Sequence, residues 1–285
     1  MHRLFLRQFG VLLLAGGMLG STSCVAQVLV PKVDGNFWQI AGEPDLGQYT
    51  SPRQQPVDFA IWQAADGTWQ LWSCIRATKV PGKTRLFYRW QANKLTDSNW
   101  TPMGISMMAD PNFGETAGGL QAPYVFKVGS EYYMVYGTWG HIALAKSKDG
   151  KTFARQLMPG GTSGMFTEGV GANTRDPMVL KIHGLYYIYY TAAPGRHGAD
   201  YVRTSKNLIH WSSSTRVAYG GSSGNGPGSA ECPFVYYDKQ SGCRVGGGAL
   251  GYPDADHRPP PKPCMQFSRT RLSRRLILTE CYGRY

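Results

Sequence analysis

The chain repeats one pattern of apolar and polar positions. A strand with proline and apolar residues is followed by a short polar turn and then by a strand rich in aromatic residues. Three copies begin at Ala122-Pro123, Asp176-Pro177 and Cys232-Pro233, with prolines 54 and 56 residues apart. A weaker copy comes earlier, with Val57–Ile61 before the turn Asp66-Gly67. Two such strands around a tight turn predict a β-hairpin in every copy.

Each of the first three units continues with a further apolar strand. These strands are predicted at residues 86–89, 142–145 and 201–204, and each is followed by a polar turn and an aromatic residue. Three or four short strands in a period of about 55 residues are typical of a β-propeller blade. We therefore predict an all-β fold, an incomplete β-propeller of about three and a half blades over residues 27–242. A β-sandwich with coincidental repeats is the alternative.

The pattern stops inside the fourth copy. An aromatic strand is due near Gly242, but residues 243–285 are rich in Arg, Pro, Gly and Cys and show no strand alternation. We expect this basic segment to lack regular structure and to form no blade-like pairing with residues 231–238. A change of reading frame that truncates the propeller would explain the break, and a native basic interaction tail is the alternative.

Residues 1–26 are predicted to be a secretory signal peptide. Arg3 and Arg7 precede the apolar run Val11–Ala15, which is too short to span a bilayer. This predicts a secreted or periplasmic protein, and Cys24 leaves open the alternative of a lipoprotein anchored through that residue. No later segment is long and apolar enough to be a transmembrane helix.

The net charge of +12 does not indicate a nucleic-acid partner once it is divided by region. Residues 243–285 hold eight Lys and Arg against three Asp and Glu, and residues 1–26 hold two Arg and no acid. The remaining body carries 20 basic and 15 acidic residues, so it is only mildly basic. We therefore expect no binding of nucleic acid.

The cysteines do not form a disulfide framework. Only Cys74 and Cys232 lie in the body of the chain. Buried free thiols are expected, with a Cys74–Cys232 disulfide as the alternative. Neither a phosphate-binding loop nor zinc-ligand spacing is present in the sequence, so no metal-ligating residue is predicted.

Acidic residues stand at the start of three predicted inner strands. Asp58 lies in the first blade, Asp176 in the third and Glu231 in the fourth. The innermost strands of a propeller line its channel, so we expect these side chains to meet in one funnel. Glycoside hydrolysis needs such a set, because one carboxylic acid protonates the leaving oxygen while a second carboxylate attacks the anomeric carbon or activates water. A solvated strand end is the structural alternative for Asp58.

With these residues the chain resembles the five-bladed β-propeller glycoside hydrolases of the arabinanase, xylosidase and invertase type, in glycoside hydrolase families 43 and 32. The resemblance rests on Asp58, Arg175-Asp176-Pro177 and Glu231-Cys232-Pro233. It implies that Asp58 is the base or the nucleophile, that Asp176 stabilises the transition state and tunes the acid, and that Glu231 is the general acid.

Five further residues are predicted to bind the sugar, because aromatic rings stack on sugar faces and polar side chains hold hydroxyl groups. They are Trp62, Gln121, Trp139, His141 and Arg175. Packing between blades is the alternative for Trp139 and His141, and a surface ion pair is the alternative for Arg175. In the connection before the second blade, Asp110 and Glu115 are expected to be solvated loop residues, and the alternative is that one of them lines the funnel.

The predicted function is a secreted glycoside hydrolase that acts on plant or algal oligo- or polysaccharides, with the activity of a truncated form left open. No cofactor is expected, and a structural calcium ion in the central channel is left open. One departure concerns the first site: the family often has Asp-Pro there, whereas Phe59 follows Asp58. A non-catalytic carbohydrate-binding propeller is the main alternative, and a scaffold for protein partners is a third.

Overall fold

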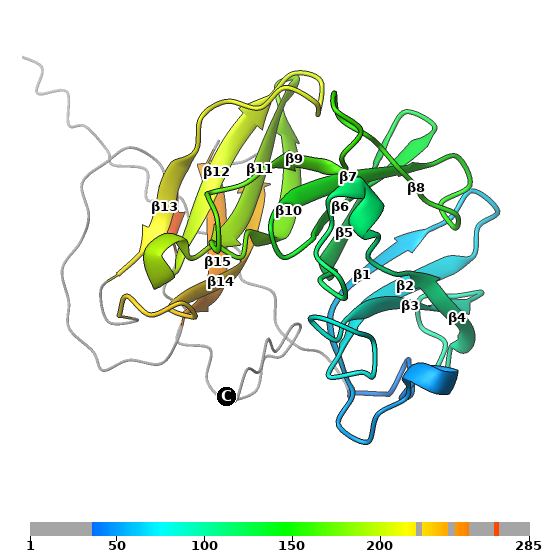
Figure 1. Cartoon of the computed structure of the whole chain (residues 1–285). Coiled ribbons are helices and arrows are strands. Elements are labelled where there is room, and N and C mark those ends of the chain that lie inside the picture. The colour runs from blue at the N-terminus through cyan, green and yellow to red at the C-terminus, as the bar shows by residue number, and fades with distance from the viewer. Residues whose placement is uncertain (1–35, 221–223, 239–242, 251–264, 268–285) are drawn as a thin grey trace, which may run out of the picture. The chain divides into compact units, whose positions relative to one another are not determined.

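A computed structural model describes residues 36–220, 224–238, 243–250 and 265–267 of the chain (Figure 1). These residues form strands, turns and three short 3-10 helices, η1 (Gly47–Tyr49), η2 (Pro111–Phe113) and η3 (Pro194–Arg196). The predicted signal peptide and Cys24 lie outside the described residues. Within the described part of the chain, no helix has the length and apolar character needed to cross a membrane.

In three sheets the strands follow one another in chain order and pair antiparallel, as predicted for blades. Blade 1 consists of β1 (Gln55–Gln63), β2 (Trp69–Arg76), β3 (Leu86–Ala92) and β4 (Thr101–Met107). Blade 2 consists of β5 (Gln121–Val128), β6 (Glu131–Gly137), β7 (Ile142–Ser147) and β8 (Ala154–Arg155), and β9 (Gly164–Phe166) also pairs with β7. Blade 3 consists of β10 (Arg175–Ile182), β11 (Leu185–Ala192), β12 (Ala199–Ser205) and β13 (Thr215–Tyr219).

The fourth sheet corrects one prediction. Its first strand, β14 (Ala230–Asp238), pairs antiparallel with β15 (Cys243–Leu250), which pairs in parallel with β16 (Met265–Phe267). The prediction that the segment after residue 242 makes no pairing with residues 231–238 is therefore wrong for residues 243–250. Ladder hydrogen bonds come from backbone groups, so a Gly-rich segment can pair without an aromatic pattern. Residues 251–264 and 268–285 lie outside the described residues.

The first strands of the four sheets lie side by side. Strand β1 packs beside β5, β5 beside β10, and β10 beside β14 (Figure 1). Successive antiparallel sheets that meet through their first strands are the arrangement of a β-propeller. The prediction of an all-β, incomplete β-propeller is confirmed.

Each inner strand breaks its pairing register at the same point of the repeat. The residues at this point have left-handed φ angles, 40° at Asp58, 43° at Ala122, 56° at Asp176 and 53° at Cys232. Such angles are uncommon outside glycine, and a β-bulge redirects the side chains around it. In blade 1 pairing resumes directly at Phe59, whereas a proline intervenes in the other three strands. The inner strand nevertheless gains one residue over its partner in all four blades, so the absence of Asp-Pro does not change the size of the bulge in blade 1.

The aromatic strands are apolar on both faces because each lies between two blades. In β6, Met134 and Tyr136 pack in the core shared with blade 1, whereas Val135 packs in the core shared with blade 3. Successive side chains of a strand point to opposite faces, so both sets are buried. Both hydrophobic cores therefore lie between sheets.

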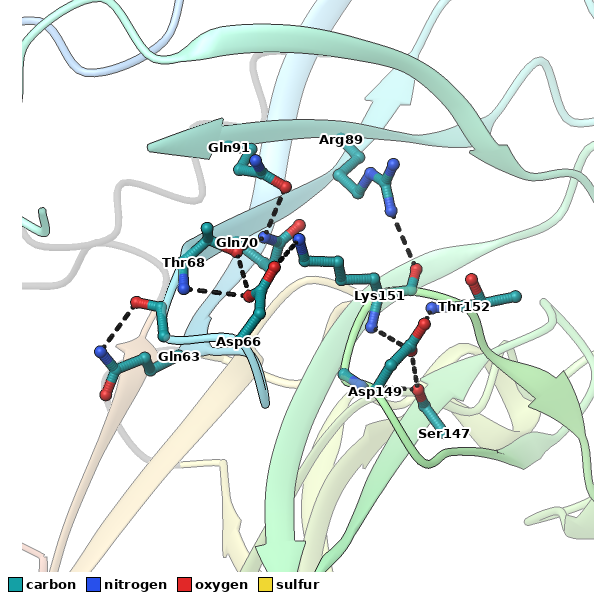
Figure 2. A network of polar contacts seen from close by, with 12 residues as sticks. Gln63, Asp66, Thr68, Gln70, Arg89, Gln91, Ser147, Asp149, Lys151 and Thr152 are labelled. Carbon is teal, nitrogen blue, oxygen red and sulfur yellow. Dashed lines mark hydrogen bonds and ion pairs between the residues drawn. The ribbon is translucent and has the colours of Figure 1, made fainter. Parts of the chain in front are cut away.

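A network of polar contacts joins blades 1 and 2 at the turns farthest from the bulges (Figure 2). Asp66 accepts hydrogen bonds from the backbone N–H and Oγ1 of Thr68 at 3.1 and 2.7 Å and forms an ion pair with Lys151. Asp149 accepts from the backbone N–H of Lys151 and Thr152 at 2.7 and 2.9 Å. Both aspartates thus shape turns through hydrogen bonds to nearby backbone groups.

Trp62 belongs to this junction and not to a sugar-binding surface, which contradicts the prediction for this residue. It is 7% exposed, and its ring packs against those of Trp72 and Phe153. Its Nε1 donates to the carbonyl oxygen of Gly150 at 2.7 Å. The side chain points into the core because β1 alternates its faces, so no ring face is left for a ligand.

We predict that Trp62→Ala lowers the free energy of unfolding by about 3–5 kcal/mol, because it leaves a cavity between two blades. Lys151→Met should cost less than about 1 kcal/mol, because its ion pair with Asp66 is partly exposed to solvent. Urea denaturation of both variants measures the difference. Equal losses would show that the polar turns, and not the aromatic core, hold the two blades together.

Candidate active site

Three carboxylates from three blades lie within electrostatic reach of one another. Asp58 is in the bulge of β1, Asp176 is in the bulge of β10, and Glu231 directly precedes the bulge of β14. The charge of Glu231 acts on both aspartates, and the charge of Asp58 acts on Asp176. The structure thus brings the three predicted catalytic residues together, while their catalytic roles stay predictions.

Arg175 links two of these carboxylates. Its Nη2 forms an ion pair with Oε1 of Glu231, and its Nε lies 3.4 Å from Oδ2 of Asp176. The side chains of Arg175 and Asp176 are 8% and 6% exposed, whereas Glu231 is 26% exposed. The surface ion-pair alternative for Arg175 is therefore wrong. Among Arg175, Asp176 and Glu231, the side chain of Glu231 is therefore the most accessible to a ligand from solvent.

Burial raises the pKa of Asp176 from 3.8 to about 7. The positive charge of Arg175 opposes this rise in pKa, while the negative charges of Asp58 and Glu231 add to it. Burial also raises the pKa of Asp58, and the positive charge of Arg85 is the main effect that lowers it. Neighbouring carboxylates disfavour one another's ionisation, so the cluster retains a proton at pH values where isolated carboxyl groups have lost theirs.

Asp200 is a fourth carboxyl group near this cluster, buried at 1% exposure, which our sequence analysis missed. In blade 3, Arg175 pairs with Thr191 and Thr191 pairs with Asp200, so the three side chains form one row across the sheet. The Oγ1 of Thr191 donates to Oδ1 of Asp200 at 2.7 Å. Burial raises the pKa of Asp200 to about 7, with Arg175 opposing and Glu231 adding to the rise. No motif marks Asp200, because its role depends on strand register.

Two arginines of blade 1 were also missed. The charges of Arg85 and Arg76 both act on Asp58 and oppose the rise of its pKa. Arg76, at the end of β2, donates through Nε and Nη2 to Oε1 of Gln55 at 3.0 and 2.7 Å. Arg85 directly precedes β3. Basic residues in a polar connection carry no periodic signal, so only the fold shows that they lie near a carboxylate.

Gln121 lies among the residues of the candidate site. It occupies the same position before the bulge of β5 that Arg175 and Glu231 occupy in later blades. A Cβ atom on Gly137 would lie 3.2 Å from the Cβ of Arg175 and 3.3 Å from the Cβ of Gln121, so both side chains flank this glycine. The Oε1 of Gln121 is buried and accepts no hydrogen bond from the described residues.

The other two predicted sugar-binding residues lie on the turn between β6 and β7. The Nζ of Lys83 is 4.7 Å, and the guanidinium of Arg85 5.1 Å, from the ring centroid of Trp139, which is half-buried. His141 packs against the backbone of Gly164, where a Cβ atom would lie 2.9 Å from its Cγ. Burial lowers the pKa of His141. Trp139 thus lies near Arg85, which acts on Asp58, whereas His141 packs against a strand of its own blade, and sugar binding by either residue stays a prediction.

Glu115 is buried, so the expectation that it is a solvated loop residue is wrong. It is 3% exposed and accepts hydrogen bonds from Tyr136 at 2.9 Å, from Ser163 at 3.0 Å and from Arg155 at 2.9 and 2.7 Å. Blade 3 repeats this network, because Glu168 accepts from Tyr190, Arg203 and Ser214. Full pairing compensates the cost of burying each carboxylate. These two glutamates therefore hold the structure of their blades.

The two cysteines in the body of the chain differ in their bonding state. Cys74 is a buried free thiol, as expected, whereas Cys232 is disulfide-bonded, so the expectation of a free thiol is wrong for Cys232 and the two residues are not joined to each other. Burial raises the pKa of Cys74 to about 12. In the described part of the chain, no group of three or more His, Cys, Asp or Glu residues is arranged to hold a metal ion.

Comparisons with known proteins return carbohydrate-active enzymes. The chain is 39% identical over 80 residues to a 1,2-beta-oligomannan phosphorylase of Thermoanaerobacter sp. (strain X514), covering 27% of this chain and 26% of that protein. A thermostable family-43 glycoside hydrolase is 19% identical with a TM-score of 0.49, covering 67% of this chain and 64% of that chain. A family 117 glycoside hydrolase of the marine bacterium Zobellia galactanivorans is 13% identical with a TM-score of 0.49, covering 72% and 65%. No family model matches the chain.

The chain therefore spans about a quarter of the curated relative and slightly less than two thirds of each of these two solved structures. The likenesses concern proteins named for the cleavage of glycosidic bonds. The assignment of any activity to this chain rests on its own residues.

We predict that the stability of the folded protein decreases as the pH rises from about 4 to about 7. Folding raises the pKa of Asp200 from 3.8 to about 7, so the folded state keeps a proton that the unfolded chain releases in this range. Each such proton contributes about 1.4 kcal/mol per pH unit. Asp200→Asn should remove this contribution and keep the hydrogen bond from Thr191. Urea denaturation at several pH values measures the slope.

Asp149→Asn is the matched control, because hydrogen bonds within its turn lower the pKa of Asp149 despite burial. This variant should keep the decrease in stability between pH 4 and 7. A wild-type slope that persists in Asp200→Asn would show that Asp200 ionises normally in the folded protein.

Proposed function

We propose that the protein is a glycoside hydrolase that uses Asp58, Asp176 and Glu231. The observation that supports this most directly is the meeting of three carboxyl groups from three blades around one buried arginine. Placing like charges together disfavours folding, and perturbed carboxyl groups of this kind are enriched in catalytic sites. A purely structural role would be served better by fully paired carboxylates such as Glu115.

The three groups divide the chemistry of glycosidic cleavage between them. In this proposal Glu231, whose side chain is 26% exposed, protonates the leaving oxygen, and Asp58 attacks the anomeric carbon or activates water. Asp176 stays buried beside Arg175 and tunes the acid through its charge. Arg175 orients both Asp176 and Glu231. Water or the sugar then approaches from the exposed side of Glu231.

The substrate proposed is an oligo- or polysaccharide of plant or algal origin, met outside the cytoplasm. The saccharide class is supported by the enzymes to which the chain is similar, all of which are named for glycan chemistry. Because one relative is named a phosphorylase, inorganic phosphate must be tested as an alternative to water. Cleavage that strictly requires phosphate would refute the hydrolase proposal. Saccharide binding without any cleavage would favour the non-catalytic propeller.

We expect Glu231→Gln to reduce cleavage of natural glycans by about 10²–10⁴-fold, because the leaving oxygen loses its proton donor. Aryl glycosides whose leaving group needs no proton should be cleaved nearly as fast as by the wild type, at least in the first step. The measurement is the initial rate on both substrate types. Glu131→Gln, at the start of β6, is the matched control. Equal losses on both substrate types would exclude Glu231 as the acid.

We expect Asp176→Asn to lower the rate and to shift the limbs of the pH–rate profile, because the charge that acts on the other two carboxyl groups is removed. The profile is recorded from pH 4 to 9 with one glycoside. The variant keeps the size of the side chain, so the fold should persist in circular dichroism. An unchanged rate and profile would limit Asp176 to a structural role.

A further inference from the structure

Lys83 and Arg85 form a basic corner around Trp139. The Nζ of Lys83 lies 4.7 Å and the guanidinium of Arg85 5.1 Å from the centroid of the indole ring. A cation within about 6 Å of an aromatic centroid is held by the ring electrostatically. The indole therefore orders two positively charged side chains that would otherwise be free to move.

The backbone of this corner is fixed by the neighbouring blade. The N–H groups of Lys83 and Arg85 donate to the carbonyl oxygens of Ala117 and Gly118, each at 2.9 Å. Contact is so close that a Cβ atom on Gly82 would lie 2.2 Å from the carbonyl oxygen of Ala117. Thr84, between the two basic residues, has a left-handed φ of 60°. The two cations are thus placed by a loop with little freedom to rearrange.

Neither cation forms a salt bridge within the described part of the chain, although Arg85 acts through its charge on Asp58. Lys83 is exposed and Arg85 half-buried, so both are open to a ligand. Because Arg85 acts on Asp58, the corner lies beside the carboxylate that the proposed function assigns to attack or base catalysis.

We propose that Lys83 and Arg85, ordered by Trp139, form a subsite for an oxyanion carried by the saccharide. This inference rests on the proposed function and extends it, because it assigns an acidic glycan as the substrate class. The group bound is a carboxylate of a uronic acid or a sulfate ester, since both offer oxygen acceptors to an ammonium and a guanidinium. Charge-assisted hydrogen bonds to such groups are roughly twice as strong as neutral ones.

The test measures binding without turnover, in full-length protein that carries Glu231→Gln. Calorimetric titrations compare trigalacturonate with its methyl ester, and a sulfated carrageenan oligosaccharide with its desulfated form. Within each pair the charge of the acidic group is removed while the sugar backbone is kept, and the two pairs distinguish a carboxylate from a sulfate. We expect one charged form to bind at least tenfold more tightly than its neutral counterpart at low salt. The ratio should decrease as salt is raised, because salt screens exposed charges.

Adding Lys83→Met should lower that charged-to-neutral ratio about five- to tenfold, and adding Lys83→Glu should abolish it. Lys94→Met is the matched control, since Lys94 is exposed on the turn after β3, at the opposite end of blade 1. It should leave the ratio unchanged. Equal affinity for the charged and neutral members of both pairs would overturn the proposal. The proposal would also be overturned if free phosphate bound at this corner but did not compete with either charged saccharide.

The proposed hydrolase activity is judged separately from these titrations. If the protein binds the charged oligosaccharide but cleaves neither form, the proposal of a basic subsite is supported and the proposal of hydrolase activity is refuted. If the protein cleaves glycans and shows no preference for charged ones, the hydrolase proposal is supported and the basic subsite is refuted. The two inferences therefore fail in different experiments.

Discussion

The inner strands all carry a left-handed residue at one point of the repeat, and the candidate site depends on this constraint. Asp58, Ala122, Asp176 and Cys232 occupy that point in four successive sheets. Such a backbone is costly for residues other than glycine, and it persists only where surrounding structure enforces it. Here the packing of each blade between its neighbours supplies that enforcement. The bulge turns the adjoining side chains away from the regular alternation, so each blade contributes polar groups to one place.

Charge balance around Arg175 is the second determinant of the site. One buried guanidinium lies among Asp176, Glu231 and Asp200, and a second positive group, Arg85, acts on Asp58. The positive charges are too few to neutralise every carboxylate of the cluster, so protons remain bound near neutral pH. The glutamates of blades 2 and 3 differ, because Glu115 and its counterpart have full sets of donors. The molecule thus contains fully paired glutamates and a separate cluster of carboxyl groups, in which burial and like charges raise the pKa of Asp58, Asp176 and Asp200.

Much of the blade architecture could be predicted from the sequence, because the aromatic strands and turns recur in a fixed order. The same repeat brought out Asp58, Asp176 and Glu231, which stand at corresponding strand starts. Contacts that depend on register or on loops could not be predicted: Asp200 enters through a cross-strand row, and Arg85 enters through a connection without periodicity. Trp62 was misjudged because a tryptophan beside a candidate acid has the same sequence signature whether it faces a ligand or a core. The pairing of β15 was missed because backbone hydrogen bonds require no side-chain pattern.

Gly82 and Gly118 give the basic corner a further property. Each has a positive φ, and a Cβ atom on either would collide with a carbonyl oxygen of the opposite loop. The path of this segment is therefore determined by main-chain contacts between blades 1 and 2, while the side chains at positions 83 and 85 project from a preset frame. Because the backbone path does not depend on these two side chains, substitutions at positions 83 and 85 can change ligand preference without disturbing the scaffold. Randomising positions 83 and 85 while both glycines are retained would make this corner a natural starting point for engineering new selectivity.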